Sequence, residues 1–198
     1  MCINVTASKK LYFAQLKKHS SKYFNIFLMQ VVHSFFESPV GVLHIQATDE
    51  HIIAVLFYNT LRNNTQAAEV PPTPPPDHPL LRLCRQQLTE YFEGNRMQFD
   101  LPLQQPGSVF QQNVWAHLTD IPYGKTISYL ELSKRIGNVK AIRAVGTTNG
   151  KNAISIIVPC HRVIGSNGEL TGYGGDLWRK KWLLQHEGKY ANGVQTLF

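Results

Sequence analysis

The sequence predicts an α/β fold in two parts, a small sheet with a helix followed by a mainly helical unit. Three observations support this prediction. Apolar and polar residues alternate over residues 43–48, which is typical of a half-buried strand. Apolar residues recur at helical spacing over 80–92. In the second half, two Ser-x-x-Gln/Glu sequences at 108–111 and 128–131 each have the form of a helix-opening capping box.

Composition and charge describe a folded globular chain. Hydrophobic residues make up 43% of the 198 residues and charged residues 17%, which excludes an intrinsically disordered protein. The net charge of +7 suits a polyanionic partner but does not identify one. Five of these positive charges are lysines in residues 1–36, which contain no Asp or Glu, so the excess elsewhere is small. No apolar run approaches the roughly 20 residues needed to span a bilayer.

The cysteines indicate neither a disulfide framework nor a zinc ribbon. Cys2, Cys84 and Cys160 are odd in number and widely spaced, and no Cys-x-x-Cys occurs. A reducing compartment is therefore expected, and each thiol has to be judged by its own surroundings.

Four segments are predicted along the chain. Residues 1–28 are expected to be an extension, with Met29 as an alternative start, although their acid-free composition also fits a transit peptide or a weak signal peptide. Residues 29–106 are assigned to an amino-terminal α/β domain, 107–189 to a second domain and 190–198 to a tail.

The amino-terminal domain is expected to be a hairpin-based sheet followed by one helix. Residues 38–41 supply a turn before the alternating strand, and the apolar run 52–58 makes the next strand. The proline-rich segment 71–79 is predicted to be a stiff surface loop, and a linker role is favoured over SH3-type recognition. A helix then begins at Leu80 and stops at Gly94, with Cys84 on its apolar stripe as a buried structural thiol.

The second domain is predicted to contain a helix-turn-helix. Ser108 opens a first helix, and residues 122–124 form a turn. Ser128 opens a short helix that ends at Gly137, and Asn138 is expected to cap the next helix, which runs towards Gly150. Such helix pairs also occur in proteins that never contact DNA, so this motif alone does not establish DNA binding.

The second helix of the pair has few side chains that could read bases. Its small residues favour close approach to a nucleic-acid backbone or a shallow groove, or alternatively close packing on a neighbouring helix. Apart from Lys140 at its start, Arg143 is its one long cation. The small residues are Ala141, Ala144, Gly146 and Thr147.

The candidate nucleophile is Cys160, where Pro-Cys-His-Arg interrupts the apolar, strand-like run 156–164. The neighbouring His161 and Arg162 are expected to create a positive field that lowers the pKa of the thiol. A water between thiol and imidazole, with a carboxylate on the other ring nitrogen, would complete a nucleophile–base–orienter arrangement. Glu187, near the end of a helix that Asp176 is expected to cap, is the candidate carboxylate. The alternatives are a buried core cysteine and a solvated surface glutamate.

Residues 107–188 resemble the catalytic domain of the O6-alkylguanine-DNA alkyltransferases. Four blocks in order carry the resemblance, namely FQQNVWAHLTDIPYGKTISYLEL, AIRAVGTTNGKN, IIVPCHRVIGSNGELTGYGG and LLQHEG. The SPVG segment at 38–41 and the helix before Gly94 are similar to the family's amino-terminal domain. The resemblance implies a ribonuclease H-like domain followed by a winged-helix-type domain that carries the active-site cysteine.

The resemblance also implies roles for individual residues. Cys160 would accept the alkyl group, activated through a water by His161, which Glu187 orients. Tyr129 would donate a proton or hydrogen bond as guanine leaves, and Arg143 would fill the gap left by the extruded nucleotide. The remaining matches are Ala141 and Gly146 on the DNA-binding helix, Asn152 at the turn before the active-site strand, and Val163, Tyr173 and Gly174 around the base pocket.

The implied activity is direct, single-turnover DNA repair by a monomer that needs no cofactor and no metal. Its partner would be double-stranded DNA that contains O6-alkylguanine, with O4-alkylthymine as an open second substrate, in the cytoplasm or in a eukaryotic nucleus. Displacement at an sp³ carbon needs a soft nucleophile and a protonated leaving group, which a thiolate and a phenol provide. No membrane association is implied.

Departures from the family pattern concern the rim of the pocket. Ala153 stands where the family usually has proline, Ser155 where some members have proline, and Val139 replaces a proline near the recognition helix. The loss of a rigid ring at 153 leaves tolerance for bulky alkyl groups open. The amino-terminal zinc site of some relatives has no counterpart, because no cysteine lies between Cys2 and Cys84.

Three other functions compete with this interpretation. A thiol hydrolase would turn over and would not need a helix pair with an intruding arginine. A non-catalytic lesion-binding relative would lack the acceptor cysteine. A transcription factor that uses the helix pair alone would leave the Pro-Cys-His-Arg segment unexplained.

Overall fold

A computed structural model describes residues 31–58 and 77–191 of the chain. The predicted extension 1–28, residues 71–76 of the proline-rich loop and most of the predicted tail lie outside the described residues. Both the sheet and the helical part described below fall within one unit that begins at Val32.

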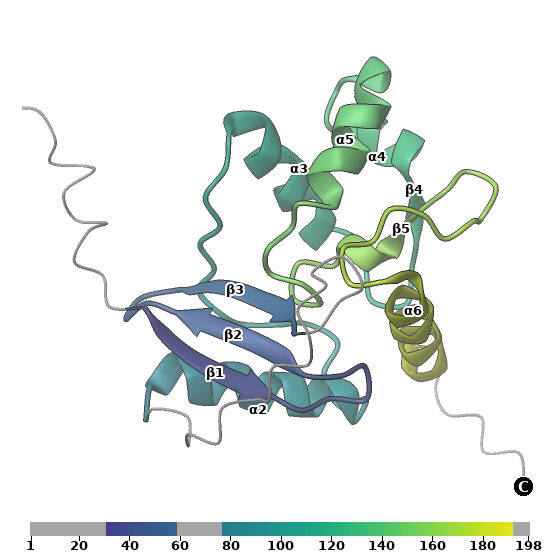
Figure 1. The fold of residues 1–198 in the computed structure, drawn as a ribbon. Helices are drawn as coiled ribbons and strands as arrows, with labels where there is room; N and C mark the ends of the chain where they lie inside the picture. The colour runs from purple at the N-terminus through teal and green to yellow at the C-terminus, as the bar shows by residue number, and fades with distance from the viewer. Residues whose placement is uncertain (1–30, 59–76, 192–198) are drawn as a thin grey trace, which may run out of the picture. The chain divides into compact units, whose positions relative to one another are not determined.

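The first part of the fold is a three-stranded antiparallel sheet with a helix packed on one face (Figure 1). Its strands are, in chain order, β1 (Val32–Phe36), β2 (Leu43–Ala47) and β3 (Ile52–Phe57). Consecutive strands are neighbours, so the predicted hairpin-based sheet is confirmed. The alternation in β2 places Leu43 and Ile45 in the core and leaves His44 and Gln46 half-buried. The 38–41 turn closes through a hydrogen bond from Gly41 N to Ser38 O at 3.0 Å.

The helix on the sheet is α2 (Pro79–Phe92), one residue longer at its start than predicted. The reason is that proline is well tolerated in a first helical turn, where its missing N–H would have had no partner. Gly94 follows at φ +81°, a left-handed conformation that suits glycine and ends the helix as expected. Cys84 is fully buried, and burial raises the pKa of its thiol to about 12, so the prediction of a structural thiol is confirmed.

The second part is mainly helical and holds a two-stranded parallel sheet. Its first helix follows Ser108, which forms both halves of the predicted capping box with Gln111. The elements are α3 (Val109–Thr119), β4 (Ile127–Ser128), α4 (Tyr129–Arg135), η3 (Val139–Ala141), α5 (Ile142–Asn149), η4 (Cys160–Arg162), β5 (Val163–Ile164) and α6 (Leu177–Ala191).

The helix pair α4–α5 forms with two differences from the prediction, because only half of the Ser128–Glu131 capping box is present and Asn138 does not cap. Ser128 Oγ accepts a hydrogen bond from Glu131 N at 3.0 Å, while the Glu131 carboxylate accepts from Arg135 one turn later. The expected cap at Asn138 is wrong, because its side chain makes no capping hydrogen bond. Instead its carbonyl oxygen accepts from Ala141 N at 3.0 Å, and the tight turn η3 takes up the residues expected in the first turn of α5.

Two further elements depart from the sequence prediction. The run 156–159 is not a strand, because Ile156 adopts φ +73° and Val158 N bonds Ile154 O at 2.9 Å across a turn. A β-branched residue in the left-handed region is uncommon and marks backbone that the surroundings hold in place. The last helix, α6, does not end at 185–188 but continues to Ala191, so Glu187 does not lie in its final residues.

The edge of β3 connects the two parts. Val55 N donates to Ala153 O at 2.8 Å, and Ser155 N donates to Val55 O at 2.9 Å. On the same strand, Ile52 exchanges backbone hydrogen bonds with residues 102–104. These hydrogen bonds pair the β3 edge of the sheet, and they fix the loop that precedes Cys160 against β3.

Candidate active site

Cys160 begins the 3₁₀ turn η4 and is 4% exposed. Asn152 Nδ2 donates to its Sγ at 3.1 Å and to Val158 O at 2.7 Å. Asn152 Oδ1 accepts from Ile154 N at 3.0 Å. Asn149, at the end of α5, donates to Cys160 O at 3.2 Å. The two asparagines therefore connect α5, the turn that follows it and the Cys160 sulfur.

The turn that follows Asn152 is held by a side chain that the sequence did not single out. Gln105 Oε1 accepts from Ala153 N at 2.8 Å and from Ile154 N at 3.1 Å. A proline at 153, which is usual in the family, would have no N–H for the first of these bonds. The bond from Ala153 N to Gln105 therefore restrains the backbone of this turn, where the absence of a proline ring was expected to leave it less rigid.

His161 and Glu187 form a buried pair. His161 Nε2 lies 2.7 Å from Glu187 Oε1, and both side chains are fully buried. Because the carboxylate accepts, Nε2 carries the proton in the neutral imidazole and Nδ1 is left with its lone pair. Nδ1 is buried and has no hydrogen-bond partner among the described residues. The imidazole is therefore oriented with one nitrogen anchored and the other able to accept a proton.

The Glu187 carboxylate accepts five hydrogen bonds. One donor is the backbone N–H of Gly124. A glycine is needed there because φ is +70° and because a Cβ would overlap Ala191 Cβ and lie 3.2 Å from the Glu187 backbone oxygen. The donors to Oε1 are His161, Arg162 Nη2 at 3.0 Å and Tyr91 Oη at 2.9 Å, and the donors to Oε2 are Arg162 Nε at 2.9 Å and Gly124 N at 3.1 Å. Tyr91 and Gly124 were not predicted as site residues, and Arg162 was expected to act on the Cys160 thiol rather than on Glu187.

The electrostatics keep this pair as a carboxylate and a neutral imidazole. Burial alone would raise the pKa of Glu187, but His161 and Arg162 outweigh it and hold the pKa well below its usual range. Burial lowers the pKa of His161 and outweighs the opposing pull of Glu187. His161 is thus uncharged at neutral pH and available as a base.

The expected lowering of the Cys160 pKa is wrong. Burial raises the pKa of this thiol, and hydrogen bonding from Asn152 and the charge of Lys180 offset only part of the rise. The reason lies in where the neighbours point. Arg162 directs its guanidinium to Glu187 and to Ile121 O rather than to the sulfur, and His161 is neutral.

Lys180 is another residue of the site that was not predicted from the sequence. It is fully buried in α6, and its Nζ donates to Val163 O at 2.6 Å and to Thr171 O at 2.8 Å. Burial lowers its pKa to about 8, against the opposing effect of Cys160. In the sequence it is one of two adjacent lysines on an amphipathic helix, so nothing distinguishes it from a solvated charge.

Tyr129 lies at the start of α4, beside the loop that follows β5. Its hydroxyl donates to Thr171 O at 3.1 Å, and Lys180 Nζ lies 5.8 Å from its ring centre. Gly172 has φ +61°, and a Cβ there would come within 3.0 Å of the Tyr129 hydroxyl, which explains glycine at this position. Burial raises the pKa of Tyr129, so the phenol keeps its proton at neutral pH.

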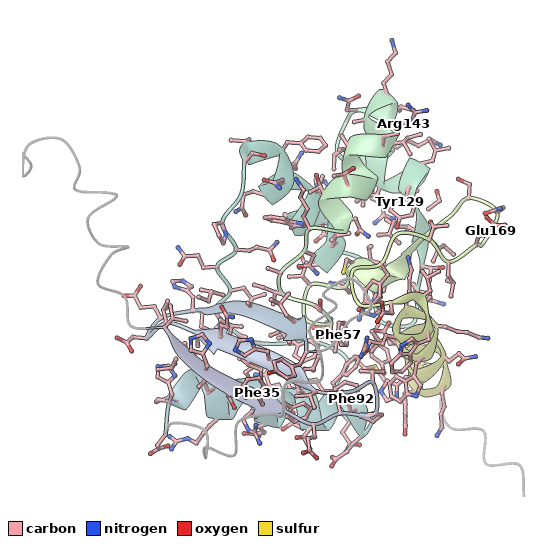
Figure 2. All side chains as sticks on the ribbon, viewed as in Figure 1. Phe35, Phe57, Phe92, Tyr129, Arg143 and Glu169 are labelled. Carbon is pink, nitrogen blue, oxygen red and sulfur yellow. The ribbon has the colours of Figure 1, made fainter. Side chains whose placement is uncertain are left out.

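The other predicted site residues fall into two groups. Val163 and Tyr173 are buried, and Gly174 approaches Gly150 O closely enough that a Cβ would lie 3.4 Å from it. Arg143 is instead exposed on α5, and Figure 2 shows it farther from the sheet than Tyr129. On the same helix pair, Ala141 and Gly146 are half-buried. The structure thus gathers Cys160, His161, Glu187, Asn152 and Val163, and places Arg143 on a separate exposed face.

Among residues 31–58 and 77–191, no group of three or more His, Cys, Asp or Glu side chains is arranged to hold a metal ion. None of the described helices combines the length and the apolar character that crossing a membrane requires.

Two family models together match most of the chain. The model of the 6-O-methylguanine DNA methyltransferase ribonuclease-like domain matches residues 31–105, and that of the same family's DNA-binding domain matches residues 109–189. These matches confirm the resemblance and the two-part fold predicted from the sequence.

Individual relatives agree with this result. The methylated-DNA–protein-cysteine methyltransferase of Methanosarcina acetivorans is 44% identical over 156 residues, which cover 79% of this chain and 97% of that protein. The constitutive enzyme of the same name from Bacillus subtilis is 46% identical over 139 residues, which cover 70% and 84%.

Solved structures share the fold as well. The Mycobacterium tuberculosis O6-methylguanine methyltransferase superposes with a TM-score of 0.70 at 40% identity, covering 85% of this chain and 99% of that one. The M. tuberculosis protein in complex with DNA gives a TM-score of 0.69 at 40% identity, covering 80% and 93%. The chain therefore belongs to the 6-O-methylguanine DNA methyltransferase family.

Proposed function

We propose that this protein repairs O6-alkylguanine in DNA by moving the alkyl group onto Cys160, and that each chain reacts once. The family supplies the reaction, methyl transfer from O6-methylguanine in DNA to a protein cysteine. One observation carries the assignment to Cys160. Its sulfur accepts a hydrogen bond from the Asn152 amide at 3.1 Å, and the adjacent residue His161 is paired with the buried Glu187, in the segment between α5 and α6.

The chemical step is a displacement at an sp³ carbon. The Cys160 Sγ–carbon bond forms as the bond from that carbon to guanine O6 breaks. The thiol proton passes through a water to His161 Nδ1, and Glu187 stabilises the resulting imidazolium. The Tyr129 hydroxyl donates a proton or a hydrogen bond to the departing guanine. The product thioether has no hydrolytic exit, so the protein is consumed.

The position of the sulfur requires that the nucleotide leave the helix. A thiol that is 4% exposed cannot reach a base inside a stacked duplex, so we infer that the base is flipped into the protein. Asn152, Val163, Tyr173 and Gly174 would surround the flipped base. Ala141 and Gly146 would allow α5 to approach the DNA backbone.

The remaining parts of the proposal concern organisation and setting. We propose an amino-terminal domain over 29–106, a catalytic DNA-binding domain over 107–189, and an extension and a tail outside them at 1–28 and 190–198. The protein would act as a monomer, without cofactor or metal, on double-stranded DNA. Because its substrate would be DNA, we propose that it acts in the cytoplasm or, in a eukaryote, in the nucleus.

Mass spectrometry of the intact protein tests this function. After mixing with a duplex oligonucleotide that contains O6-methylguanine, the protein is expected to gain the mass of one methyl group on Cys160, because a thioether blocks a second reaction. The repaired oligonucleotide is expected to equal the protein consumed. Several repaired strands per chain, or no protein adduct, would reject the mechanism in favour of a hydrolase.

The exposed side chain of Arg143 provides a separate prediction for nucleotide flipping. Extrusion of a base costs a few kcal/mol of stacking, and an arginine that enters the gap offsets part of it. Arg143→Ala is therefore expected to slow repair of duplex DNA by about tenfold, since about 1.4 kcal/mol corresponds to that factor.

Reaction with the free O6-methylguanine base needs no flipping and serves as the internal control for Arg143→Ala. Its rate is expected to stay near that of the wild type. Lys140→Ala is the matched variant, because Lys140 is also an exposed cation and lies in η3, directly before α5. Equal losses on duplex and free base would contradict the role of Arg143.

A further inference from the structure

We propose that Tyr91, which belongs to the amino-terminal part of the fold, is a positioning residue of the alkyl-transfer reaction that holds the Glu187 oxygen facing His161. This inference rests on the proposed function, because it assigns Tyr91 to the same site. Tyr91 lies in α2, in a segment whose sequence pattern indicates only a core residue on an apolar helical stripe.

The hydrogen-bond geometry defines what Tyr91 does. Its Oη lies 2.9 Å from Glu187 Oε1, the atom that also accepts from His161 Nε2 at 2.7 Å. Because the carboxylate is ionised, it has no proton to give, and the phenol has to be the donor. Arg162 Nη2 is a third donor to this oxygen, at 3.0 Å. Three donors therefore share one oxygen. The Tyr91 hydroxyl partly neutralises the negative charge on Oε1, so this oxygen attracts the His161 proton less strongly.

The hydroxyl of Tyr91 is held firmly in this place. The side chain is fully buried, and its ring lies in an aromatic cluster with centroids 5.2–6.0 Å away. The backbone carbonyl of Tyr91 also lies 2.8 Å from His186 Nε2, one residue before Glu187 in α6. Helices α2 and α6 are thus connected at both main chain and side chain. The cluster partners are Phe92, Phe99, Tyr123 and His186.

The charged groups around His161 set the direction of the effect. Burial, Arg162 and Lys180 all lower the pKa of His161, and Glu187 alone raises it. Two other titratable side chains lie nearby in sequence. Cys160 directly precedes His161, and His186 directly precedes Glu187 on α6, where the Glu187 charge opposes the lowering of the His186 pKa by burial. A donor on Oε1 weakens the pull of Glu187 on the imidazole proton. Without the Tyr91 hydroxyl, that pull is stronger and the pKa of His161 is higher.

The test is the pH dependence of alkyl transfer in Tyr91→Phe, which keeps the ring and removes only the hydroxyl. The lower limb of the rate profile is expected to move up by about one pH unit, since one hydrogen bond to a charged group shifts a pKa on this order. Well below that limb, the rate of the variant is then about tenfold lower than that of the wild type. The NMR titration of the His161 imidazole in the full-length protein is expected to move by the same amount.

Tyr123→Phe is the matched control. Its ring belongs to the same aromatic cluster, 6.0 Å from Tyr91, but its hydroxyl is buried and has no hydrogen-bond partner among the described residues. Its pH profile is expected to equal that of the wild type.

The outcomes separate this inference from the proposed function. If the wild type takes no alkyl group on Cys160, the proposed function fails. If the wild type reacts and Tyr91→Phe lowers the rate equally at every pH, or leaves the profile unchanged, Tyr91 only supports packing and the inference fails. A measurement of urea unfolding for both variants shows whether lost stability accounts for any loss of rate.

Discussion

A Cys160→Ser variant is expected to take up no alkyl group from O6-methylguanine in DNA, although it folds. Oxygen replaces sulfur with little change in shape, and a hydroxyl can still accept the hydrogen bond that Asn152 gives to Sγ. A serine hydroxyl is, however, a much harder and far less acidic nucleophile than a thiol, and His161 alone is too weak a base to ionise it. The intact mass of the variant after incubation with the modified duplex is the measurement.

Cys84→Ala is the control for this experiment. Cys84 is the other described cysteine and is fully buried in α2. Its removal is expected to cost about 1 kcal/mol of stability, as core truncations commonly do, while the methyl adduct still forms. An adduct on Cys160→Ser, or none on Cys84→Ala under conditions where it is folded, would exclude Cys160 as the acceptor.

Glu187→Gln is expected to have the second largest effect, on both stability and rate. The variant keeps the shape of the side chain but removes the charge that Arg162 and His161 face in a buried site. Removal of one partner of a buried ion pair leaves an uncompensated charge and costs about 3–5 kcal/mol. Loss of the group that stabilises the imidazolium is expected to slow transfer on the order of 10²-fold or more. Urea unfolding and single-turnover rates measure the two effects.

The matched variant for the stability effect is Glu131→Gln. Glu131 pairs with Arg135 at 3.3 Å on the surface of α4, where both side chains are more than a third exposed. Such a pair contributes only about 0.3–0.5 kcal/mol, so this variant is expected to unfold nearly as the wild type does. A similar, small loss for Glu187→Gln and Glu131→Gln would contradict the structural importance of the buried pair.

The pH dependence of stability has a defined sign in the wild type. The folded state lowers the pKa of Glu187 below its ordinary 4.5, so the carboxylate stabilises the fold above that pH and loses this contribution as the pH falls. The pKa of His161 is also lowered, from 6.5, so the unfolded chain takes up that proton first and stability falls below pH 6.5. Glu187→Gln is expected to lack the part of the acid-induced loss that lies below pH 4.5.

Local chemistry explains which parts of the fold the sequence predicts correctly. The alternation in β2 and the Ser108 capping box act over a few residues, so both appear in the structure as expected. The predicted cap at Asn138 fails because its main chain is bonded to Ser133 and Ala141 in a local turn, and the predicted strand at 156–159 fails because tertiary contacts override local preference. At the second of these, the main chain of Ala153 and Ser155 is bonded to β3, and Ile156 is turned into a left-handed conformation.

The sequence predicts only part of the site, because some of its residues are brought together by tertiary contacts alone. Cys160 and His161 are adjacent in an unusual polar segment, and the sequence pattern predicts that Glu187 lies in a last helical turn, where a carboxylate opposes the helix dipole. Tyr91 and Lys180 carry no such signal, because a tyrosine on an apolar stripe and a lysine on an amphipathic helix are both ordinary. Their roles depend on which atom each side chain contacts in the folded chain. Tyr91 and Glu187, for example, are 96 residues apart in sequence.

The burial of Cys160 has a consequence for the lifetime of the unreacted protein. A chain that reacts once is lost just as surely by oxidation or by capping with a small thiol reagent as by repair. Susceptibility to both follows thiolate character and solvent access, and here the sulfur is 4% exposed with a raised pKa. The same shielding makes the thiol a poor general nucleophile and protects it before it reacts. Under the proposed mechanism, this protection keeps its one transfer available for a base brought directly against the sulfur.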